Sequence, residues 1–332
     1  MNFLLEIRNL KIEFESFEGI SHVLEDIHLT LGRGETLGLV GETGCGKSIT
    51  AKAILRLLPI PPARIVSGNI LFQGEDLLGK SEEEMKEIRG KQIAMVFQDP
   101  STFLNPVFTV EEQLVDVILS HKMGDRSHIQ AKGLHRRGAI QRAIELLREV
   151  KIPEPEARIK SYPHEFSGGM RQRVLIAMAL SGSPQILIAD EPTTALDVTI
   201  QAQILRLINE LVQKHGHSVL LISHDLGVVA SVCQRIAVMY AGNMVENCST
   251  LQLFKRPLHP YTQGLLNSIL TFSKREATAQ GIKGMIPDLI QPPPGCRFHP
   301  RCLLAMGVCQ RGKPPFVEFE EGHWVSCHLY TK

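Results

Sequence analysis

The feature that most constrains the fold of this chain is a glycine-rich segment between an apolar run and a helical pattern. The apolar residues 36–40 precede GETGCGKS at residues 41–48, which fits the pattern G-x-x-x-x-G-K-[ST]. Glycines let successive backbone N–H groups turn inward around phosphate oxygens, and the N-terminus of the following helix adds positive potential. The segment, named here the phosphate loop, therefore predicts a nucleotide site in which Lys47 reaches the β- and γ-phosphates and Ser48 ligates Mg²⁺.

Two further apolar runs are followed by polar groups and are expected to end at the same edge of a parallel sheet. Residues 185–189 precede Asp190 and Glu191, and residues 218–223 precede His224. Because parallel sheets bind ligands at the carboxyl ends of their strands, we expect these side chains to lie near the phosphate loop. Asp190 is predicted to hold Mg²⁺ and Glu191 to polarise the attacking water.

The remaining pattern alternates strands with helices and predicts an α/β fold. Strands are expected over 4–14 and 23–31, and the helix after the phosphate loop is expected to continue to about Leu58, before Pro59. Residues 80–165 have a mostly helical pattern that begins at Ser81. Further helices are expected over about 169–180 and from about Val198 and Asp225.

Composition excludes several classes of protein. The 36 Lys and Arg nearly balance the 35 Asp and Glu, for a net charge of +1, so no charge excess favours nucleic acid. The apolar runs are well short of the roughly 20 residues that span a bilayer. The first residues lack the basic and apolar regions of a signal peptide, so we expect a cytosolic location.

Six motifs in a fixed order resemble the ATP-binding subunits of ABC transporters over about residues 4–245. They are the phosphate loop, Gln98, Ser167-Gly168-Gly169, Asp190-Glu191, Ala195-Leu196-Asp197 and His224. The resemblance implies an α/β P-loop NTPase (RecA-like) core with an antiparallel β-subdomain at 1–80 and 166–245. It also implies a helical subdomain at 81–165, which carries Gln98 near its start and leads to the signature Ser167-Gly168-Gly169. A small metal-binding C-terminal extension is implied at 246–332.

The family resemblance also assigns roles to individual residues. Glu191, His224 and Gln98 are implied in catalysis, and Ser48, Gln98 and Asp190 in binding Mg²⁺. The nucleotide-binding residues implied are Phe14, Gly41, Glu42, Thr43, Gly44, Cys45, Gly46, Lys47, Ser48 and Ile49. Phe14, with Phe17 as the alternative, would stack on adenine. Ser167, Gly168 and Gly169 would contact ATP held by the other subunit, and Asp197 would lie between the two sites.

One departure from the family pattern is visible in the signature, which usually reads Leu-Ser-Gly-Gly-Gln. This chain has Phe166 and Met170 at its ends. The Ser-Gly-Gly that donates to phosphate is intact, so activity is expected to be retained.

The chain further resembles one branch of the family, the dipeptide and oligopeptide importer ATPases and their nickel-importing relatives. The resemblance rests on residues 162–173 and 190–205 and on two tail segments, 259–262 and 293–302. It implies ATP- and Mg²⁺-dependent import of dipeptides or oligopeptides, with nickel as the alternative cargo. A non-transport ABC ATPase and an ATP-driven electron-transfer protein are the alternatives in other classes.

The partners implied are a second, homologous ATPase in a head-to-tail dimer, two membrane permease subunits and, indirectly, an extracytoplasmic solute-binding protein. No nucleic acid is expected among them. The implied location is the cytoplasmic face of the membrane, where the chain would bind peripherally.

Four cysteines lie close together near the end of the sequence. Cys296, Cys302, Cys309 and Cys327 are interspersed with His299, His323 and His328 in a segment rich in proline. Such a segment lacks apolar residues for a core, which a bound metal can replace. The spacing alone leaves a [4Fe–4S] cluster, a zinc ion and unliganded thiols open. Because the peptide-importer branch carries such a cluster, the resemblance favours [4Fe–4S].

Cys45 is separately predicted to face solvent, as a small side chain open to oxidation.

Overall fold

The computed structural model describes residues 3–122, 132–193, 196–268 and 282–331. Contacts group the chain into two compact units, one made of Met1–Lys80 and Leu221–Lys332 and the other of Ser81–Leu220. Strand β8 (Ser218–Ser223) contains the boundary between them. Within the described residues, no helix is both long and apolar enough to cross a membrane.

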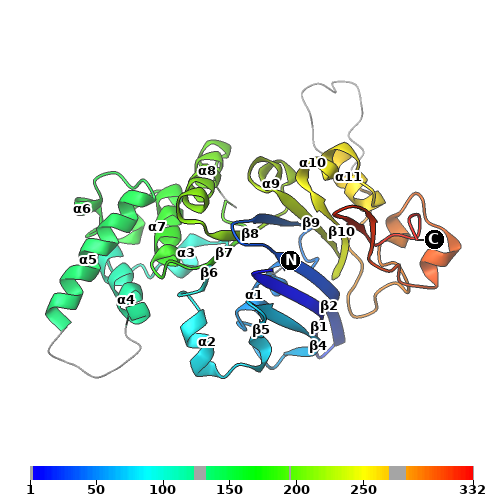
Figure 1. Ribbon diagram of the computed structural model, residues 1–332, viewed down its shortest axis with the longest axis horizontal. Helices are drawn as coiled ribbons and strands as arrows, with labels where there is room; N and C mark the ends of the chain where they lie inside the picture. Colours follow the sequence, from blue (N-terminus) through cyan, green and yellow to red (C-terminus); the bar gives the residue numbers. More distant parts are fainter. Residues whose placement is uncertain (1–2, 123–131, 194–195, 269–281, 332) are drawn as a thin grey trace. The chain divides into compact units, whose positions relative to one another are not determined.

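The first unit contains a four-stranded antiparallel sheet with the order β2-β1-β4-β5 (Figure 1). Its strands are β1 (Leu5–Ser16), β2 (Gly19–Leu31), β4 (Ala63–Phe72) and β5 (Glu75–Asp76). The register of β1 against β4 shifts between Arg8 and Lys11. Gly68 lies opposite this bulge with φ +96°, and a Cβ there would be 2.5 Å from the Asn9 carbonyl oxygen. The bulge therefore requires glycine.

A second set of strands in this unit carries the phosphate loop. They follow one another as β11 (Val317–Glu320), β12 (His323–Val325), β10 (Asn243–Ser249), β9 (Arg235–Tyr240) and β3 (Thr36–Val40). β3 and β9 are parallel, and every residue of β3 is buried. A Cβ at Gly38 would lie 2.1 Å from Val229 of α9 (Leu226–Val232), so this glycine lets the helix pack directly on the strand.

The second unit combines two parallel strands, β6 (Ile93–Val96) and β7 (Ile186–Asp190), with helices (Figure 1). Its helices are α2 (Glu82–Ile88), α3 (Pro100–Phe103), α4 (Val110–Lys122), α5 (Lys132–Glu149), α6 (Pro155–Arg158), α7 (Gly168–Leu180) and α8 (Val198–His215). Helix α7 contacts α4, α5, α8 and β6. Its apolar residues Val174, Ile176 and Ala177 are fully buried, which makes α7 the centre of this unit.

Most of the predicted elements are confirmed. The strand over 218–223, the helices that begin at Val198 and after Asp225, and the helix start at Ser81 all form as expected. The strand β6 was missed within the region predicted to be mostly helical. Four apolar residues are too few to show a period, and β6 is fixed by pairing with β7 rather than by its own sequence.

The predicted end of the helix after the phosphate loop is wrong. Helix α1 (Lys47–Ile54) ends before Leu55, four residues earlier than expected. Arg56 adopts a left-handed conformation with φ 52°. The Leu57 N–H then donates to the Lys52 carbonyl (2.8 Å) and the Arg56 N–H to that of Ala53 (3.0 Å). This is a Schellman C-cap, formed here without the usual glycine, and it ends the helix before Pro59 can.

The C-terminal extension is tied to the rest of the first unit by a buried carboxylate. It includes α10 (Thr250–Lys255), α11 (Pro260–Ser268), β11 and β12. The Glu246 side chain on β10 is fully buried and accepts hydrogen bonds from the Leu258 N–H (2.7 Å), the His259 N–H (2.9 Å) and His323 Nε2 (2.8 Å). One side chain thus joins β10, the start of α11 and β12.

We expect Glu246→Ala to lower the free energy of unfolding by about 3–5 kcal/mol, because it leaves two amides and an imidazole buried without their acceptor. Chemical denaturation followed by circular dichroism measures the change. Glu320→Ala is the matched control, since that carboxylate forms only a partly exposed ion pair with Arg256, worth at most about 1 kcal/mol. Equal losses in the two variants would contradict the role given to Glu246.

Candidate nucleotide-binding site

The phosphate loop turns sharply between the end of β3 and the start of α1. Gly41, Gly44 and Gly46 have φ of +156°, +86° and +108°. A Cβ at Gly41 would lie 2.2 Å from the Met239 carbonyl oxygen, and one at Gly46 would lie 2.6 Å from Leu24 Cδ2. Both backbone conformation and lack of space therefore require glycine at these two positions.

Lys47, the first residue of α1, points back over this loop. Its ammonium donates to the carbonyls of Gly41 (2.8 Å) and Glu42 (3.1 Å), and the residue is only 5% exposed. Ser48 and Ile49 are half-buried, whereas Thr43 and Gly44 at the tip are exposed. The loop therefore presents its tip to solvent and holds its one cation against two of its own carbonyls, which is an arrangement suited to phosphate.

The prediction that Cys45 faces solvent is wrong. Its side chain is fully buried under the loop, with its sulfur 3.9 Å from Lys47 Nζ. Burial raises the pKa of this thiol, so it is neither accessible nor readily ionised. The loop also packs against the turn that follows β9, because the Cys45 carbonyl accepts a hydrogen bond from the Gly242 N–H (2.9 Å).

In the second unit, Gln98 and Glu191 lie within hydrogen-bonding distance. Glu191 directly follows β7, and Gln98 lies two residues beyond β6, the parallel neighbour of β7. Gln98 Nε2 donates to Glu191 Oε2 (3.0 Å). Glu191 has a left-handed φ of 46°, which turns the chain sharply after the buried Asp190. The carboxyl end of this strand pair thus carries two carboxylates and an amide, which are oxygen donors of the kind Mg²⁺ prefers.

The signature residues form the N-terminus of α7, next to the N-terminus of α8. Ser167 is the N-cap of α7, and its hydroxyl accepts the Met170 N–H (3.4 Å). Asp197 is the N-cap of α8 and accepts the Ile200 N–H (2.9 Å). A Cβ at Gly169 would lie 2.5 Å from Ile200, so the glycine permits close packing of the two helices. Ser167 and Gly168 are exposed. Ala195, also part of the predicted motif, lies outside the described residues.

The other predicted residues are in the first unit. Phe14 is a half-buried residue of β1 paired with Ser21 and Ala63, while Phe17 in the following turn is exposed. His224 is exposed directly after β8, where Asp225 caps α9 by accepting from the Gly227 N–H (2.8 Å).

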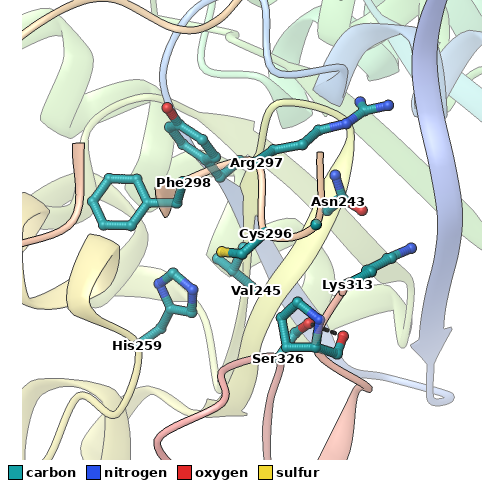
Figure 2. Close-up of a pocket in the computed structure, with 11 residues that line it drawn as sticks. Asn243, Val245, His259, Cys296, Arg297, Phe298, Lys313 and Ser326 are labelled. Atoms are coloured by element: carbon teal, nitrogen blue, oxygen red, sulfur yellow. Dashed lines mark hydrogen bonds between the residues drawn. The ribbon is translucent and has the colours of Figure 1, made fainter. Parts of the chain in front are cut away.

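The four C-terminal cysteines line a single pocket, named here the cysteine pocket. Cys296, Cys302, Cys309 and Cys327 share its wall with Phe298, Leu304 and Met306 and with the histidines His259, His299 and His328. None of these four cysteines forms a disulfide bond. Figure 2 shows Cys296 from the adjoining pocket, with its sulfur on the side of Phe298 and His259. His323 does not line the cysteine pocket, because it is bonded to Glu246.

Ionisation of all four thiols in this pocket is electrostatically unfavourable when no cation is bound. Burial, with a smaller contribution from the neighbouring thiols, raises the pKa of Cys327 to about 11, and burial also raises those of Cys296 and Cys302. Among the described residues, only Glu246, Cys248 and His323 place three potential ligand atoms within 4.8 Å of one another. No three of the pocket sulfurs therefore lie within 4.8 Å of one another, whereas tetrahedral zinc with Zn–S bonds of about 2.3 Å would place its sulfurs roughly 3.8 Å apart.

Two residues that contact the phosphate loop were not predicted. The Glu42 N–H donates to the Tyr261 hydroxyl (2.9 Å), and Arg301 donates to both carboxylate oxygens of Glu42 (3.0 and 3.1 Å). Both residues occur in the C-terminal segments that carry the branch resemblance. Nothing in the local sequence indicates a contact across 219 and 259 positions.

Comparison with known proteins agrees with this geometry. Residues 24–194 match the ABC transporter family, and residues 245–309 match the oligopeptide/dipeptide transporter C-terminal region. The chain is 49% identical to a probable peptide ABC transporter ATP-binding protein of Sinorhizobium fredii, with 98% of this chain and 95% of the relative covered. It is 47% identical to the oligopeptide transport ATP-binding protein OppD of Bacillus subtilis, with 98% and 88% covered. The dipeptide transport ATP-binding protein DppD of the same organism is also 47% identical, with 99% and 95% covered.

A solved structure supports the same assignment. The ATP-binding cassette MJ0796, in a dimeric post-hydrolysis state with ADP and Pi, superimposes with a TM-score of 0.63 and 26% identity over 74% of this chain and 98% of that one. Together, the matches and the phosphate-loop geometry lead to one conclusion: this chain belongs to the ATP-binding proteins of the ABC transporter family and carries the oligopeptide/dipeptide transporter C-terminal region.

Proposed function

We propose that this chain is the ATPase subunit that binds and hydrolyses ATP with Mg²⁺ to power the import of dipeptides or oligopeptides through a membrane permease. The observation that carries the proposal is the presence in one chain of a complete phosphate loop and the C-terminal region of peptide transporters. The relatives reported above are named for peptides, which favours peptide over nickel as the cargo.

We assign a separate role to each of the domains predicted from the sequence. Residues 1–80 and 166–245 would form the nucleotide-binding core with its β-subdomain, residues 81–165 the helical subdomain, and residues 246–332 the extension. In this division, Phe14 stacks on adenine, the phosphate loop holds the phosphates through its amides and Lys47, and His224 contacts the γ-phosphate.

Hydrolysis is proposed to depend on the strand end that carries Glu191. The Gln98 amide holds one oxygen of the Glu191 carboxylate (3.0 Å) and so fixes its orientation, which a general base requires. Ser48, Gln98 and Asp190 supply the hydroxyl, amide and carboxylate oxygens that would hold Mg²⁺. Bound there, Mg²⁺ would neutralise charge that develops on the phosphates.

A second, homologous ATPase subunit is proposed as the direct partner in a head-to-tail dimer. The exposed Ser167 and Gly168 at the start of α7 provide helix N-terminal amides for a phosphate, and the adjacent Asp197 would lie between the two sites. Two permease subunits, and indirectly an extracytoplasmic binding protein, complete the proposed transporter. The chain would then work at the cytoplasmic face of the membrane.

The cysteine pocket is proposed to hold a [4Fe–4S] cluster. Four thiols line one partly apolar pocket, and no three of their sulfurs lie as close together as the ligands of a single tetrahedral ion. A cationic iron group bound there would offset the mutual repulsion of the four thiolates, whose ionisation burial otherwise disfavours. Cys296, Cys302, Cys309 and Cys327 would be its ligands, and the cluster would staple a segment that has few regular elements.

The transport proposal is tested by reconstituting the chain with its partner ATPase and permeases in proteoliposomes. We expect ATP-dependent uptake of a labelled dipeptide or short oligopeptide when the binding protein is added, because the ATPase cycle drives the permease between its two states. Uptake of ⁶³Ni²⁺ without uptake of peptide would contradict the proposed cargo.

Glu191→Gln is expected to leave ATP binding unchanged and to lower kcat about 10²–10⁴-fold, because the amide cannot accept a proton from the attacking water. Equilibrium binding of ATP and phosphate release by the reconstituted complex measure the two effects. Glu210→Gln is the control, since Glu210 is an exposed residue of α8 paired with Lys151. Hydrolysis near the normal rate in Glu191→Gln would remove Glu191 from its proposed role.

Protein purified without oxygen is expected to contain about four iron and four sulfide per chain and to absorb broadly near 400 nm. Cys302→Ser should reduce the iron content, whereas Cys233→Ser should not, because Cys233 is buried beside α9 and does not line the cysteine pocket. One zinc per chain and no sulfide would refute the cluster and leave the ATPase proposal standing.

A further inference from the structure

The second residue of the phosphate loop, Glu42, is held by two side chains of the C-terminal extension. Its backbone N–H donates to the Tyr261 hydroxyl at 2.9 Å, and Arg301 Nη1 lies 3.1 and 3.0 Å from its two carboxylate oxygens. Both the main chain and the side chain of Glu42 are therefore fixed from outside the loop. All three residues belong to the first unit.

Arg301 is itself held rigidly. Its Nε donates to the Lys283 carbonyl (3.0 Å) and its Nη2 to those of Gly284 (3.0 Å) and Ile282 (3.4 Å). Its guanidinium also lies over the ring of Tyr240, 5.6 Å from the centroid, and the side chain is only 8% exposed. A guanidinium whose donors are occupied in this way loses little freedom when it binds Glu42.

Tyr261 is equally constrained. It is fully buried near the start of α11, and its ring packs on those of Tyr240 and Phe298, with centroids 4.7 and 5.4 Å away. Phe298 also lines the cysteine pocket, and Cys302 directly follows Arg301. The same packed segment thus supports both the cysteine pocket and the contacts to Glu42.

The phosphate loop needs such support because of its glycines. Each residue fixed in one conformation costs about 1–2 kcal/mol of conformational entropy, and glycine costs more than other residues. If the binding-competent conformation is only partly populated, the apparent dissociation constant for ATP rises in proportion. Contacts that hold the loop before ATP arrives lower that cost.

We propose that Tyr261 and Arg301 are positioning residues for ATP binding, which hold the phosphate loop in its binding conformation through Glu42. The proposal rests on the proposed function, since it presumes that this loop binds ATP. Neither residue touches the reacting atoms. Their effect appears in the affinity for ATP and not in the rate of the chemical step.

The sharpest test is Tyr261→Phe, which removes one oxygen and keeps the buried ring. We expect the Kd for ATP to rise about 3–10-fold, while iron content, melting temperature and kcat at saturating ATP stay near those of the wild type. Tyr330→Phe is the matched control, because its hydroxyl donates to the Leu258 carbonyl (3.0 Å) in the same extension and does not reach the loop. It should leave the Kd unchanged.

A double-mutant cycle tests Arg301 through its partner. Arg301→Gln and Glu42→Gln should each raise the Kd for ATP, and the double variant should raise it no further than the larger single effect. Arg301→Lys, which keeps the charge but loses the forked donor, should fall between wild type and Arg301→Gln. Additive effects would show that Arg301 acts on affinity by some route other than Glu42 and would overturn its assignment.

Two other results for Tyr261→Phe would refute the positioning role of this residue. An unchanged Kd in Tyr261→Phe refutes the positioning role. A raised Kd accompanied by loss of iron or a large fall in melting temperature refutes it as well, since the hydroxyl would then serve the folding of the extension. Failure of the proposed function is recognised separately, because then the wild type would not bind ATP or Lys47→Ala would bind it equally well.

Discussion

The geometry of the first unit depends on how closely the phosphate loop packs against the end of β9. Gly41 approaches the Met239 carbonyl and Gly46 approaches Leu24 so closely that no side chain fits at either position. Cys45 fills the space beneath the loop, and its carbonyl accepts the Gly242 N–H. Because the underside is closed by packing, the amides at the exposed tip are left for a ligand. The direction in which α1 leaves the loop follows from the same contacts.

Local sequence predicted this region well because the signals are local. An entirely buried strand, a glycine pattern and a following helix are each visible within a few residues, and β8 has the bounds that its apolar run indicated. The end of α1 was not visible, because a left-handed arginine supplies the C-cap that glycine usually provides. Likewise, burial of Cys45 is decided by the Gly41 and Lys47 contacts and not by its place in the pattern.

Residues of the candidate site that are far apart in the sequence are brought together by the pairing of neighbouring strands. Gln98 and Glu191 are 93 positions apart, yet they form a hydrogen bond because β6 and β7 are parallel neighbours. That pairing could not be foreseen from the residues alone, since β6 itself was missed. The four cysteines were predicted as a group and do line one pocket, whereas His323, equally close in sequence, is bonded to Glu246 in another buried group. Sequence proximity therefore indicated which thiols share a pocket, and it could not show which histidines lie beside them.

The C-terminal extension is part of the nucleotide-binding unit in a physical sense. Glu246 anchors its beginning, and Tyr261 and Arg301 bring it to Glu42 from 219 and 259 positions away. Closing such long loops is entropically costly, but the cost rises only slowly with length, so a few buried bonds suffice to hold the ends together. Without these residues the Glu42 amide would lose its acceptor and its carboxylate would lose its cation, in the one loop whose shape the site most requires. In this chain, the conformation of the phosphate loop therefore depends on contacts that the C-terminal extension provides.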